Sequence, residues 1–217
     1  MQSSNGLITK ITKESLTIKM NQHQVWNAIA PEWNEFKINP AHHVEEFLKG
    51  KKGNILDLGS GSGRHLQKIP KGKMYLVDFS EKMIELAKEK AKKKKIDAEF
   101  VVAELGKLPF EKDFFDSAIF IAALHCIEGE ANRKKAVKEL FRVLKKGAQV
   151  EVGVWNKNSK KFHNAKSKER FVKWRDKGSR YYYLYDADEI YKLFEKAGFK
   201  IVFKEAPKQM IIFVAEK

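Results

Sequence analysis

The sequence predicts an α/β fold, a mostly parallel sheet with helices on both faces. Short apolar runs rich in β-branched and aromatic residues alternate with longer amphipathic segments, which is the pattern of consecutive βαβ units. The chain has 217 residues, of which 43% are hydrophobic and 12% aromatic, so it is too apolar for a disordered chain. We therefore expect a single folded domain over residues 1–217.

The expected elements follow in chain order. Helices near 24–29 and 41–48 belong to an N-terminal helical cover, 1–50. Strands are expected at 54–58, 74–78, 99–103, 117–122 and 149–155, and helices at 63–68, 81–93 and 133–144.

Local signals indicate where these elements begin and end. Ser80 is expected to cap the helix at 81–93. Lys145 and Lys146 precede Gly147, which is expected to cap the helix at 133–144. Two C-terminal strands, 199–203 and 210–214, flank a turn at 207–209, so a hairpin should add an antiparallel strand to the sheet.

The charge balance indicates a polyanionic partner, either nucleic acid or an anionic membrane surface. There are 43 Lys and Arg against 28 Asp and Glu, a net charge of +15, and the isoelectric point is near 9.6. Residues 1–20 lack the continuous apolar run of a secretory signal, and the longest apolar stretch, 118–124, is too short to span a bilayer. We therefore expect a soluble protein.

The lone Cys126 excludes an internal disulfide and a zinc ribbon, and it indicates a reducing, cytoplasmic setting. The six histidines show no metal-ligand spacing with Cys or carboxylates, so no metal is expected.

The segment NILDLGSGSG at 54–63 carries the strongest functional signal. An apolar strand runs into glycines at alternate positions, Gly59, Gly61 and Gly63, which is typical of a loop that a ligand approaches closely. The dinucleotide fingerprint G-x-G-x-x-G would need a third glycine where this chain has Arg64. A pyrophosphate-binding NAD site is therefore disfavoured.

Acidic residues lie at the ends of three successive strands. The carboxylate of Asp57, beside the glycine loop, favours a ligand with an ammonium and a sulfonium group over a phosphate. Asp78 follows Gly59 by 19 residues, close to the offset at which an acid accepts hydrogen bonds from ribose hydroxyls. Glu104 is expected near an adenine edge. These positions suit S-adenosylmethionine, and glycines that serve tight turns alone are the alternative.

These residues resemble the class I S-adenosylmethionine-dependent methyltransferases. The segments VWNAIAP at 25–31 and RYYYLY at 180–185, with the stretch 115–125, look like the tRNA wobble-uridine carboxymethyl methyltransferases. The resemblance implies a Rossmann-like, seven-stranded, mostly parallel sheet with helices on both faces and a C-terminal antiparallel strand. It also implies methylation of the carboxylate of 5-carboxymethyluridine, or a related form, in the tRNA anticodon loop, in some family members with a small activator subunit.

The resemblance also implies the site residues. Trp26 lies in the first of the similar segments and is expected to bind substrate. Cofactor binding is expected at Asp57, Gly59, Gly61, Gly63, Arg64, Asp78, Phe79, Glu104, Leu105 and Ala122.

A basic insert, residues 156–180, concentrates the positive charge. Ten Lys and Arg against two Asp and Glu give it a net charge of +8, and aromatic residues are interleaved with the basic ones. We interpret it as a tRNA-binding surface; a solvated lid with aromatic core anchors is the alternative. Residues 181, 183 and 185 share one face of an extended segment, so some of these tyrosines are packing residues. Substrate contacts are expected at Lys160, Lys161, Lys166, Lys168, Trp174 and Tyr181.

His125 and Arg180 are the candidate catalytic residues. His125 follows the fourth strand, where an acceptor would approach the methyl group; a core or loop histidine is the alternative. A carboxylic acid is ionised at neutral pH, so its methylation needs no general base. The guanidinium of Arg180 suits the task of holding that anion in line with the methyl group, and an ion pair with Asp186, Asp188 or another surface acid is the alternative.

Two other functions remain compatible with the sequence. One is methylation of a small-molecule carboxylate or a quinone-type substrate. The other is a tRNA-binding scaffold that holds the cofactor without turnover.

Overall fold

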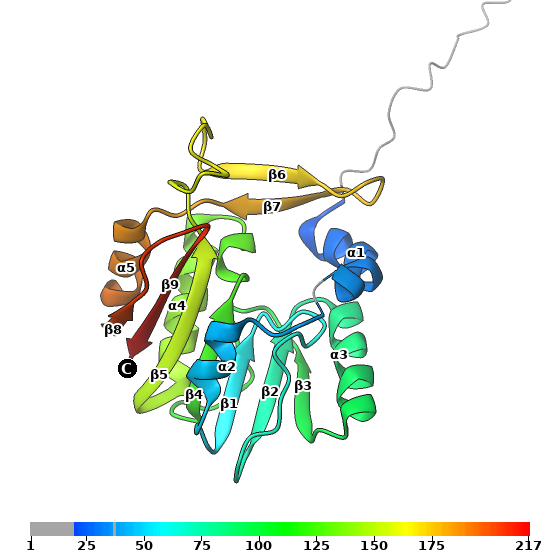
Figure 1. Ribbon diagram of the computed structural model, residues 1–217, viewed down its shortest axis with the longest axis vertical. Coiled ribbons are helices and arrows are strands. Elements are labelled where there is room, and N and C mark those ends of the chain that lie inside the picture. Colours follow the sequence, from blue (N-terminus) through cyan, green and yellow to red (C-terminus); the bar gives the residue numbers. More distant parts are fainter. Residues whose placement is uncertain (1–19, 37) are drawn as a thin grey trace, which may run out of the picture.

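The computed structural model describes residues 20–36 and 38–217 (Figure 1). The expectation that residues 1–20 hold no secretory signal therefore falls almost wholly outside the described residues. The elements are α1 (Gln22–Phe36), α2 (His42–Leu48), β1 (Asn54–Leu58), β2 (Lys73–Asp78), α3 (Glu81–Lys94), β3 (Ala98–Val102), β4 (Phe115–Ile121), the 3-10 helix η1 (Leu124–Cys126), α4 (Glu130–Val143), β5 (Leu144–Trp155), β6 (Glu169–Lys173), β7 (Ser179–Tyr183), α5 (Ala187–Lys196), β8 (Lys200–Lys204) and β9 (Met210–Glu216).

Seven strands form one sheet in the order β3-β2-β1-β4-β5-β9-β8. The first five are parallel, and β9 is antiparallel to both β5 and β8. The predicted α/β architecture and the C-terminal antiparallel strand are therefore confirmed. Because the chain reverses strand order between β1 and β4, the carboxyl ends of these two strands flank the switch point, where open α/β sheets bind their ligands.

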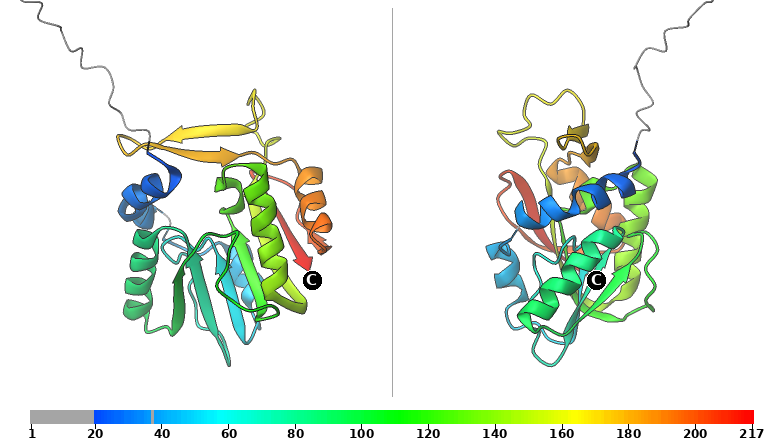
Figure 2. Two further views of the ribbon diagram at one scale, coloured as in Figure 1. Left: turned by 180° about the vertical axis from the view of Figure 1, so that it is seen from behind. Right: turned by 90° about the vertical axis from the view of Figure 1, so that its right-hand side faces the viewer.

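Helices cover both faces of the sheet (Figure 2), and apolar side chains are buried between the sheet and the helices. On one face, Leu140 of α4 and Phe194 of α5 join a core with strand residues such as Phe120. On the other face, Leu48 of α2 and Ala87 of α3 pack on a second cluster. Both clusters are fully or almost fully buried, so each provides hydrophobic stabilisation of the layers that surround the sheet.

Two of the predicted local features are wrong. Residues 61–65 form turns and not the helix expected at 63–68, because Gly61 and Gly63 adopt φ of 53° and 70°, outside the right-handed helical region. Gly147 does not cap α4. The strand β5 begins at Leu144, directly after the helix, and Gly147 lies within that strand, where its N–H donates to the carbonyl of Lys217 at 2.7 Å.

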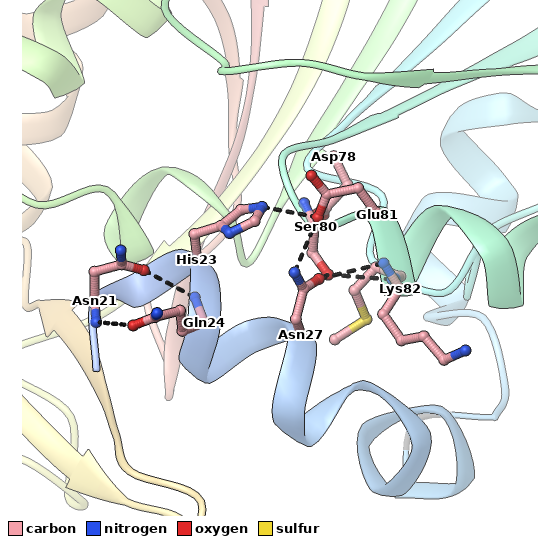
Figure 3. Close-up of polar contacts among 9 residues, drawn as sticks. Asn21, His23, Gln24, Asn27, Asp78, Ser80, Glu81 and Lys82 are labelled. Atoms are coloured by element: carbon pink, nitrogen blue, oxygen red, sulfur yellow. Dashed lines mark hydrogen bonds and ion pairs between the residues drawn. The ribbon is translucent and has the colours of Figure 1, made fainter. Parts of the chain in front are cut away.

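The predicted helix start at Ser80 is confirmed. Its Oγ accepts a hydrogen bond from the N–H of Met83 at 3.1 Å, which satisfies one of the free donors of the first turn of α3. In turn, Asn27 of α1 binds this helix start: its Oδ1 accepts from Ser80 Oγ at 2.5 Å and its Nδ2 donates to Glu81 at 2.9 Å (Figure 3). The cover helix α1 is thereby attached to the end of β2.

A separate two-stranded antiparallel sheet, the hairpin β6–β7, crosses above the carboxyl ends of the parallel strands (Figure 1). Gln22 of α1 joins the cover helix to this hairpin, because its Nε2 donates to Ser179 O at 3.1 Å and its Oε1 accepts from Tyr181 N at 2.8 Å. The predicted insert and the predicted N-terminal cover therefore meet above one edge of the main sheet. Within the described part of the chain, no helix is long and apolar enough to cross a membrane.

Candidate cofactor and acceptor site

The glycine loop follows β1 at the switch point. A Cβ atom at Gly59, which has φ of 73°, would lie 2.2 Å from the Cβ of Ala123, so the segment after β4 packs directly on this glycine. At Gly61 a Cβ would meet nothing within 3.9 Å, and Nε1 of Trp33 is among the nearest atoms. The loop is therefore closed toward β4 and open toward the cover helix, where a ligand can approach its backbone.

Two buried carboxyl groups lie beside this loop without a cationic partner. Asp57 is 2% exposed, and its Oδ2 has no hydrogen-bond partner among the described residues. Burial, and then the charge of Asp78, raises the pKa of Asp57 to about 8. Burial also raises the pKa of Asp78 to about 6, against the hydrogen bonds that it accepts from the N–H groups of Ser80 and Gly61. A ligand with an ammonium and a sulfonium group would stabilise both ionised carboxylates, so these residues fit S-adenosylmethionine.

Three further predicted cofactor residues, Glu104, Leu105 and Ala122, lie just after the carboxyl ends of β3 and β4. The charge of Glu104, which is exposed, raises the pKa of Asp78, so the two carboxyl groups are close. Leu105 Cδ1 would be 3.5 Å from a Cβ at Gly59. Ala122 directly follows β4 and has φ of 58°, a left-handed conformation that is rare outside glycine and often occurs at functional sites.

The other two predicted cofactor residues contact the N-terminal part of the chain. Phe79 is half-buried, and its ring meets that of His23 edge-on at 5.7 Å. Arg64 donates from Nε to the carbonyl of Asn39 at 2.5 Å, so it ties the glycine loop to the segment between α1 and α2. A role for Arg64 in cofactor binding stays a prediction without a supporting contact.

Arg180 is enclosed by aromatic rings on the acceptor side. Its guanidinium carbon lies 4.6 Å from the ring centre of Trp174, 5.2 Å from Tyr182, 5.3 Å from Trp33 and 6.0 Å from Trp26. Such rings attract a cation through their negative faces and exclude water from it. The predicted substrate residues Trp26 and Trp174 are thus brought to the predicted catalytic arginine.

No ion pair neutralises Arg180 within the described residues. Nη1 donates to Tyr182 Oη at 2.5 Å, and Nε is buried without any hydrogen-bond partner. The alternative of a pair with Asp186 or Asp188 is not found, because Asp186 instead accepts from Lys168 at 2.8 Å. A buried, unpaired guanidinium is costly unless a ligand anion completes it, which indicates an anion-binding role.

Cys126 shows that the acceptor side and the cofactor side adjoin. Burial raises the pKa of its thiol, the charge of Arg180 lowers that pKa, and the charge of Asp78 raises it. Both charged groups therefore act on one sulfur, whose S–H donates to the carbonyl of Ala122 at 3.5 Å. Cys126 also packs against the cluster that contains Trp26 and Met83, so it lies between the candidate cofactor residues and the candidate acceptor residues.

His125 is 1% exposed and lies between two aromatic rings. Its Nδ1 accepts a hydrogen bond from the N–H of Trp155 at 3.3 Å, and its ring centre is 5.2 Å from the ring of Trp155 and 5.6 Å from that of Tyr182. Burial lowers the pKa of His125 to about 3, so the imidazole is neutral at pH 7 and carries its proton on Nε2. It is suited to positioning an acceptor and not to accepting a proton at Nδ1.

The predicted tRNA contacts separate into two groups. Lys160, Lys161 and Lys166 are exposed, and Lys161 lies 4.7 Å from the centre of the Trp155 ring. By contrast, Lys168 pairs with two carboxylates, and Tyr181 is 1% exposed with its hydroxyl bonded to Glu169 and Arg133. For Lys168 and Tyr181 the structure therefore indicates packing roles, since neither is available to a phosphate or a base.

Three residues of the site were not predicted. Trp33 follows Trp26 by seven residues, about two helical turns, so both lie on one face of α1. The helical periodicity of the sequence could therefore have predicted that Trp33 lies near Trp26. Tyr182 alternates with its neighbours on β7, so it shares a face with Arg180. Cys126 carried no sequence signal for this position. Among residues 20–36 and 38–217, no group of three His, Cys, Asp or Glu side chains is placed to hold a metal ion.

Relatives at the sequence level carry the same type of domain. Residues 49–198 match a family model described as a methyltransferase domain. The tRNA (carboxymethyluridine(34)-5-O)-methyltransferase of Arabidopsis thaliana is 33% identical over 155 residues, which cover 70% of this chain and 37% of that protein. The Schizosaccharomyces pombe protein of the same name is 28% identical over 211 residues, covering 83% and 89% of the two chains. The chain spans about a third of the length of several curated relatives that it matches.

A solved structure shows the same fold. The methyltransferase in complex with the Haloferax volcanii Trm112 methyltransferase activator has a TM-score of 0.68 and 17% identity, covering 91% of this chain and 98% of that one. With its glycine loop, its strand-end acids and a family model that matches most of its length, the chain belongs to the methyltransferase domain family, with S-adenosylmethionine as its cofactor.

Proposed function

We propose that this protein transfers a methyl group from S-adenosylmethionine to the carboxylate of a carboxymethylated uridine at the wobble position of tRNA. The observation that carries the proposal is the buried Arg180, whose Nε has no partner and which no carboxylate of the described residues neutralises. A site for a neutral acceptor atom would have no use for such a cation. The names of the Arabidopsis and fission-yeast relatives support the same acceptor.

S-adenosylmethionine, when bound, supplies a methyl group on a positively charged sulfur. In this proposal Asp57 holds the ammonium group and Asp78 the ribose hydroxyls. The open side of the glycine loop, at Gly61, admits the cofactor to the backbone. The ends of β1, β2 and β3 thereby orient the methyl group toward the segment at Ala122–Cys126, where the acceptor enters.

The acceptor needs alignment and not deprotonation, because its carboxylic acid is already ionised at neutral pH. Arg180 binds the carboxylate through its planar fork. The surrounding tryptophans exclude water, so the anion exchanges its hydration shell for fixed donors. His125, neutral and held at Nδ1, is positioned to orient the acceptor from Nε2. This preorganisation lowers the entropic part of the barrier.

The tRNA substrate is proposed to meet the exposed Lys160, Lys161 and Lys166 of the basic insert, none of which forms an ion pair with a described residue. Their charges would attract phosphates through release of counterions. An activator subunit forms part of the proposal, because the Haloferax volcanii protein of the same fold is in complex with the Trm112 methyltransferase activator. The free thiol of Cys126 fits the proposed cytoplasmic location.

Mass spectrometry of tRNA nucleosides from cells with and without the gene tests the proposal. We expect the methyl ester of a carboxymethylated uridine to disappear on deletion, with its free acid accumulating. Wild-type protein should restore the ester, and the Arg180→Lys variant should not. An unchanged nucleoside profile on deletion would contradict the proposal and leave a small-molecule carboxylate as the acceptor.

A further inference from the structure

Helix α4 carries an arginine on the face that it buries. Arg133 is 5% exposed, and Ala136, Val137 and Leu140 follow it on the same face at helical spacing. No carboxylate of the described residues forms an ion pair with Arg133. A buried guanidinium without an ion-pair partner lowers stability, whereas an apolar side chain at this position would not. We therefore expect the charge to serve a purpose other than stability.

One nitrogen of this guanidinium joins two segments of the proposed acceptor site. Nη1 of Arg133 donates to the carbonyl of Ile127 at 3.1 Å and to the hydroxyl of Tyr181, also at 3.1 Å. Ile127 directly follows the short helix η1, which carries His125. Tyr181 directly follows Arg180 on β7. Arg133 thus connects the two segments that hold the candidate catalytic residues.

The alternation of β7 explains how a contact on one face can orient the other. Successive side chains of a strand point to opposite faces. Tyr181 and Tyr183 share the face that meets α4, where the guanidinium carbon of Arg133 lies 3.9 Å from the ring centre of Tyr183. Arg180 and Tyr182 point to the opposite face, toward the candidate acceptor site. The start of α4 lies below the hairpin (Figure 1), so Arg133 holds the strand from beneath.

The hydroxyl of Tyr181 is suited to a cationic donor. It donates its proton to Glu169 Oε1 at 3.0 Å, so its oxygen is left as an acceptor only. A guanidinium has donors and no acceptor, and Arg133 is therefore the matching partner for this oxygen.

Other bonds hold the cofactor side of η1. The N–H of Ala122 donates to the carbonyl of Gly153 in β5 at 2.8 Å, and Ala123 packs on the glycine loop. Arg133 binds at Ile127, the opposite end of η1. Loss of Arg133 should therefore loosen the acceptor side of the site and leave the cofactor side intact.

We propose that Arg133 is a positioning residue for methyl transfer. It contacts neither cofactor nor acceptor, and it acts through Ile127 and Tyr181, which set the position of His125 relative to Arg180. Alignment of the reacting atoms supplies much of the rate in such a displacement, so a small shift between these two residues lowers kcat. This inference rests on the proposed function, and it adds to it a residue of α4.

Arg133→Met tests the proposal through the kinetics of tRNA methylation, because methionine keeps an unbranched stem and removes the donors. We expect kcat at saturating tRNA to fall about thirtyfold, while the affinity for S-adenosylmethionine stays within about twofold.

Arg142→Met is the matched control. Arg142 lies at the opposite end of α4 and also donates to backbone carbonyls, those of Phe110 and Leu108, at 2.8 and 3.1 Å. This variant should lose stability and keep kcat. An equal fall of kcat in both variants would show that Arg133 only stabilises the fold, and would overturn the proposal.

A double-mutant cycle tests the path from Arg133 to the strand. Tyr181→Phe removes only the hydroxyl, so it should lower kcat less than Arg133→Met does. The double variant should be no slower than Arg133→Met alone, because the two residues share one hydrogen bond. Additive losses would show that Arg133 and Tyr181 act independently, which contradicts the proposal.

The thiol of Cys126, the single cysteine of the chain, gives a readout that needs no substrate. It lies in η1, so a chromogenic disulfide reagent should label it about fivefold faster in Arg133→Met than in Arg142→Met. The two variants are compared at denaturant concentrations that give them the same free energy of unfolding. Equal rates would show that Arg133 does not hold η1. If the wild-type protein methylates no tRNA, the proposed function fails, while the labelling rates still decide whether Arg133 holds η1.

Discussion

The guanidinium carbon of Arg180 lies 4.6 Å from the ring centre of Trp174, and Trp174 is in turn anchored by Glu32, whose Oε2 accepts from its Nε1 at 2.7 Å. Glu32 also pairs with Arg175 and Lys177. The carboxylate of Glu32 is therefore paired with other cations and does not neutralise Arg180. The guanidinium of Arg180 can thus bind an anion of the substrate. Helix α1, which supplies Glu32, Trp26 and Trp33, is thus part of the proposed acceptor site.

Arg180→Lys should lower kcat/KM for tRNA methylation at least a hundredfold while cofactor affinity stays within twofold. A lysine keeps the charge but loses the planar fork and the fit to the aromatic cage. Arg175→Lys is the matched control, since Arg175 is exposed and pairs with Glu32. Steady-state kinetics and calorimetry measure the two quantities. Comparable activity of the two variants would show that the fork is not needed.

The buried Asp57 predicts an unusual pH dependence of stability without cofactor. Its pKa is raised to about 8 in the folded protein from an ordinary value near 4. Between these values the folded state retains a proton that the unfolded state releases, so the free energy of unfolding falls as pH rises. Asp57→Asn should remove this fall, so the variant gains stability relative to wild type from pH 5 to pH 8. Its affinity for the cofactor should be at least tenfold lower.

Denaturant unfolding at several pH values, without cofactor, checks this prediction. Parallel stability profiles for wild type and Asp57→Asn would show that the Asp57 carboxyl titrates normally. Saturating cofactor should reduce the difference, because a cationic ligand stabilises the ionised form.

Gly59→Ala should destabilise the protein and abolish cofactor binding. The added Cβ would lie 2.2 Å from Ala123 Cβ, so the loop after β4 must move. Gly50→Ala is the control, because Gly50 has a similar φ of 77° but open space around the added Cβ. Only the control should keep cofactor affinity, at a backbone cost of about 1–2 kcal/mol in unfolding free energy. Equal losses of cofactor affinity in both variants would show that the positive φ alone, and not the contact with Ala123, causes the effect.

A triple variant in which Lys160, Lys161 and Lys166 are changed to Gln should bind tRNA more weakly. The negative slope of log affinity against log salt concentration should become less steep by about 2. Lys88, Lys92 and Lys93, exposed on α3, are the control when changed in the same way. Filter binding over a salt series gives both slopes. An equal reduction in the two triple variants would indicate attraction to net charge alone, without a role for the insert.

The strands, and the acidic residues near their ends, could be read from the sequence because both depend on local patterns. Asn54–Leu58 is a short apolar run before glycines, and Ser80 is a strong cap, so both were predicted correctly. The turn at 61–65 was missed because positive φ at Gly61 and Gly63 depends on the packing of Gly63 against Ala87 and Leu76. Gly147 was misread because pairing with the C-terminal strand overrides the capping signal.

Tertiary contacts decided which basic and aromatic residues are available. Lys168 and Lys166 look alike in sequence, but Lys168 meets Asp186 and Glu189. Tyr181 and Arg180 are neighbours, yet the alternation of β7 turns the tyrosine toward Glu169 and the arginine toward Trp174. Predicting which of these side chains are available requires the pairing register of β6 and β7, and residue composition alone does not give this register.

The chemical identity of the methylated product tests the central claim most directly. Methyl transfer to a carboxylate forms an ester, which mild alkali hydrolyses with release of methanol, whereas methyl groups on base nitrogen or carbon atoms survive. Purified protein, supplied with an activator subunit where needed, is incubated with radiolabelled S-adenosylmethionine and tRNA that carries carboxymethylated wobble uridine. We expect labelled tRNA whose label is released as methanol by alkali, and no label on tRNA with the Arg180→Lys variant. An alkali-stable label would contradict the central claim.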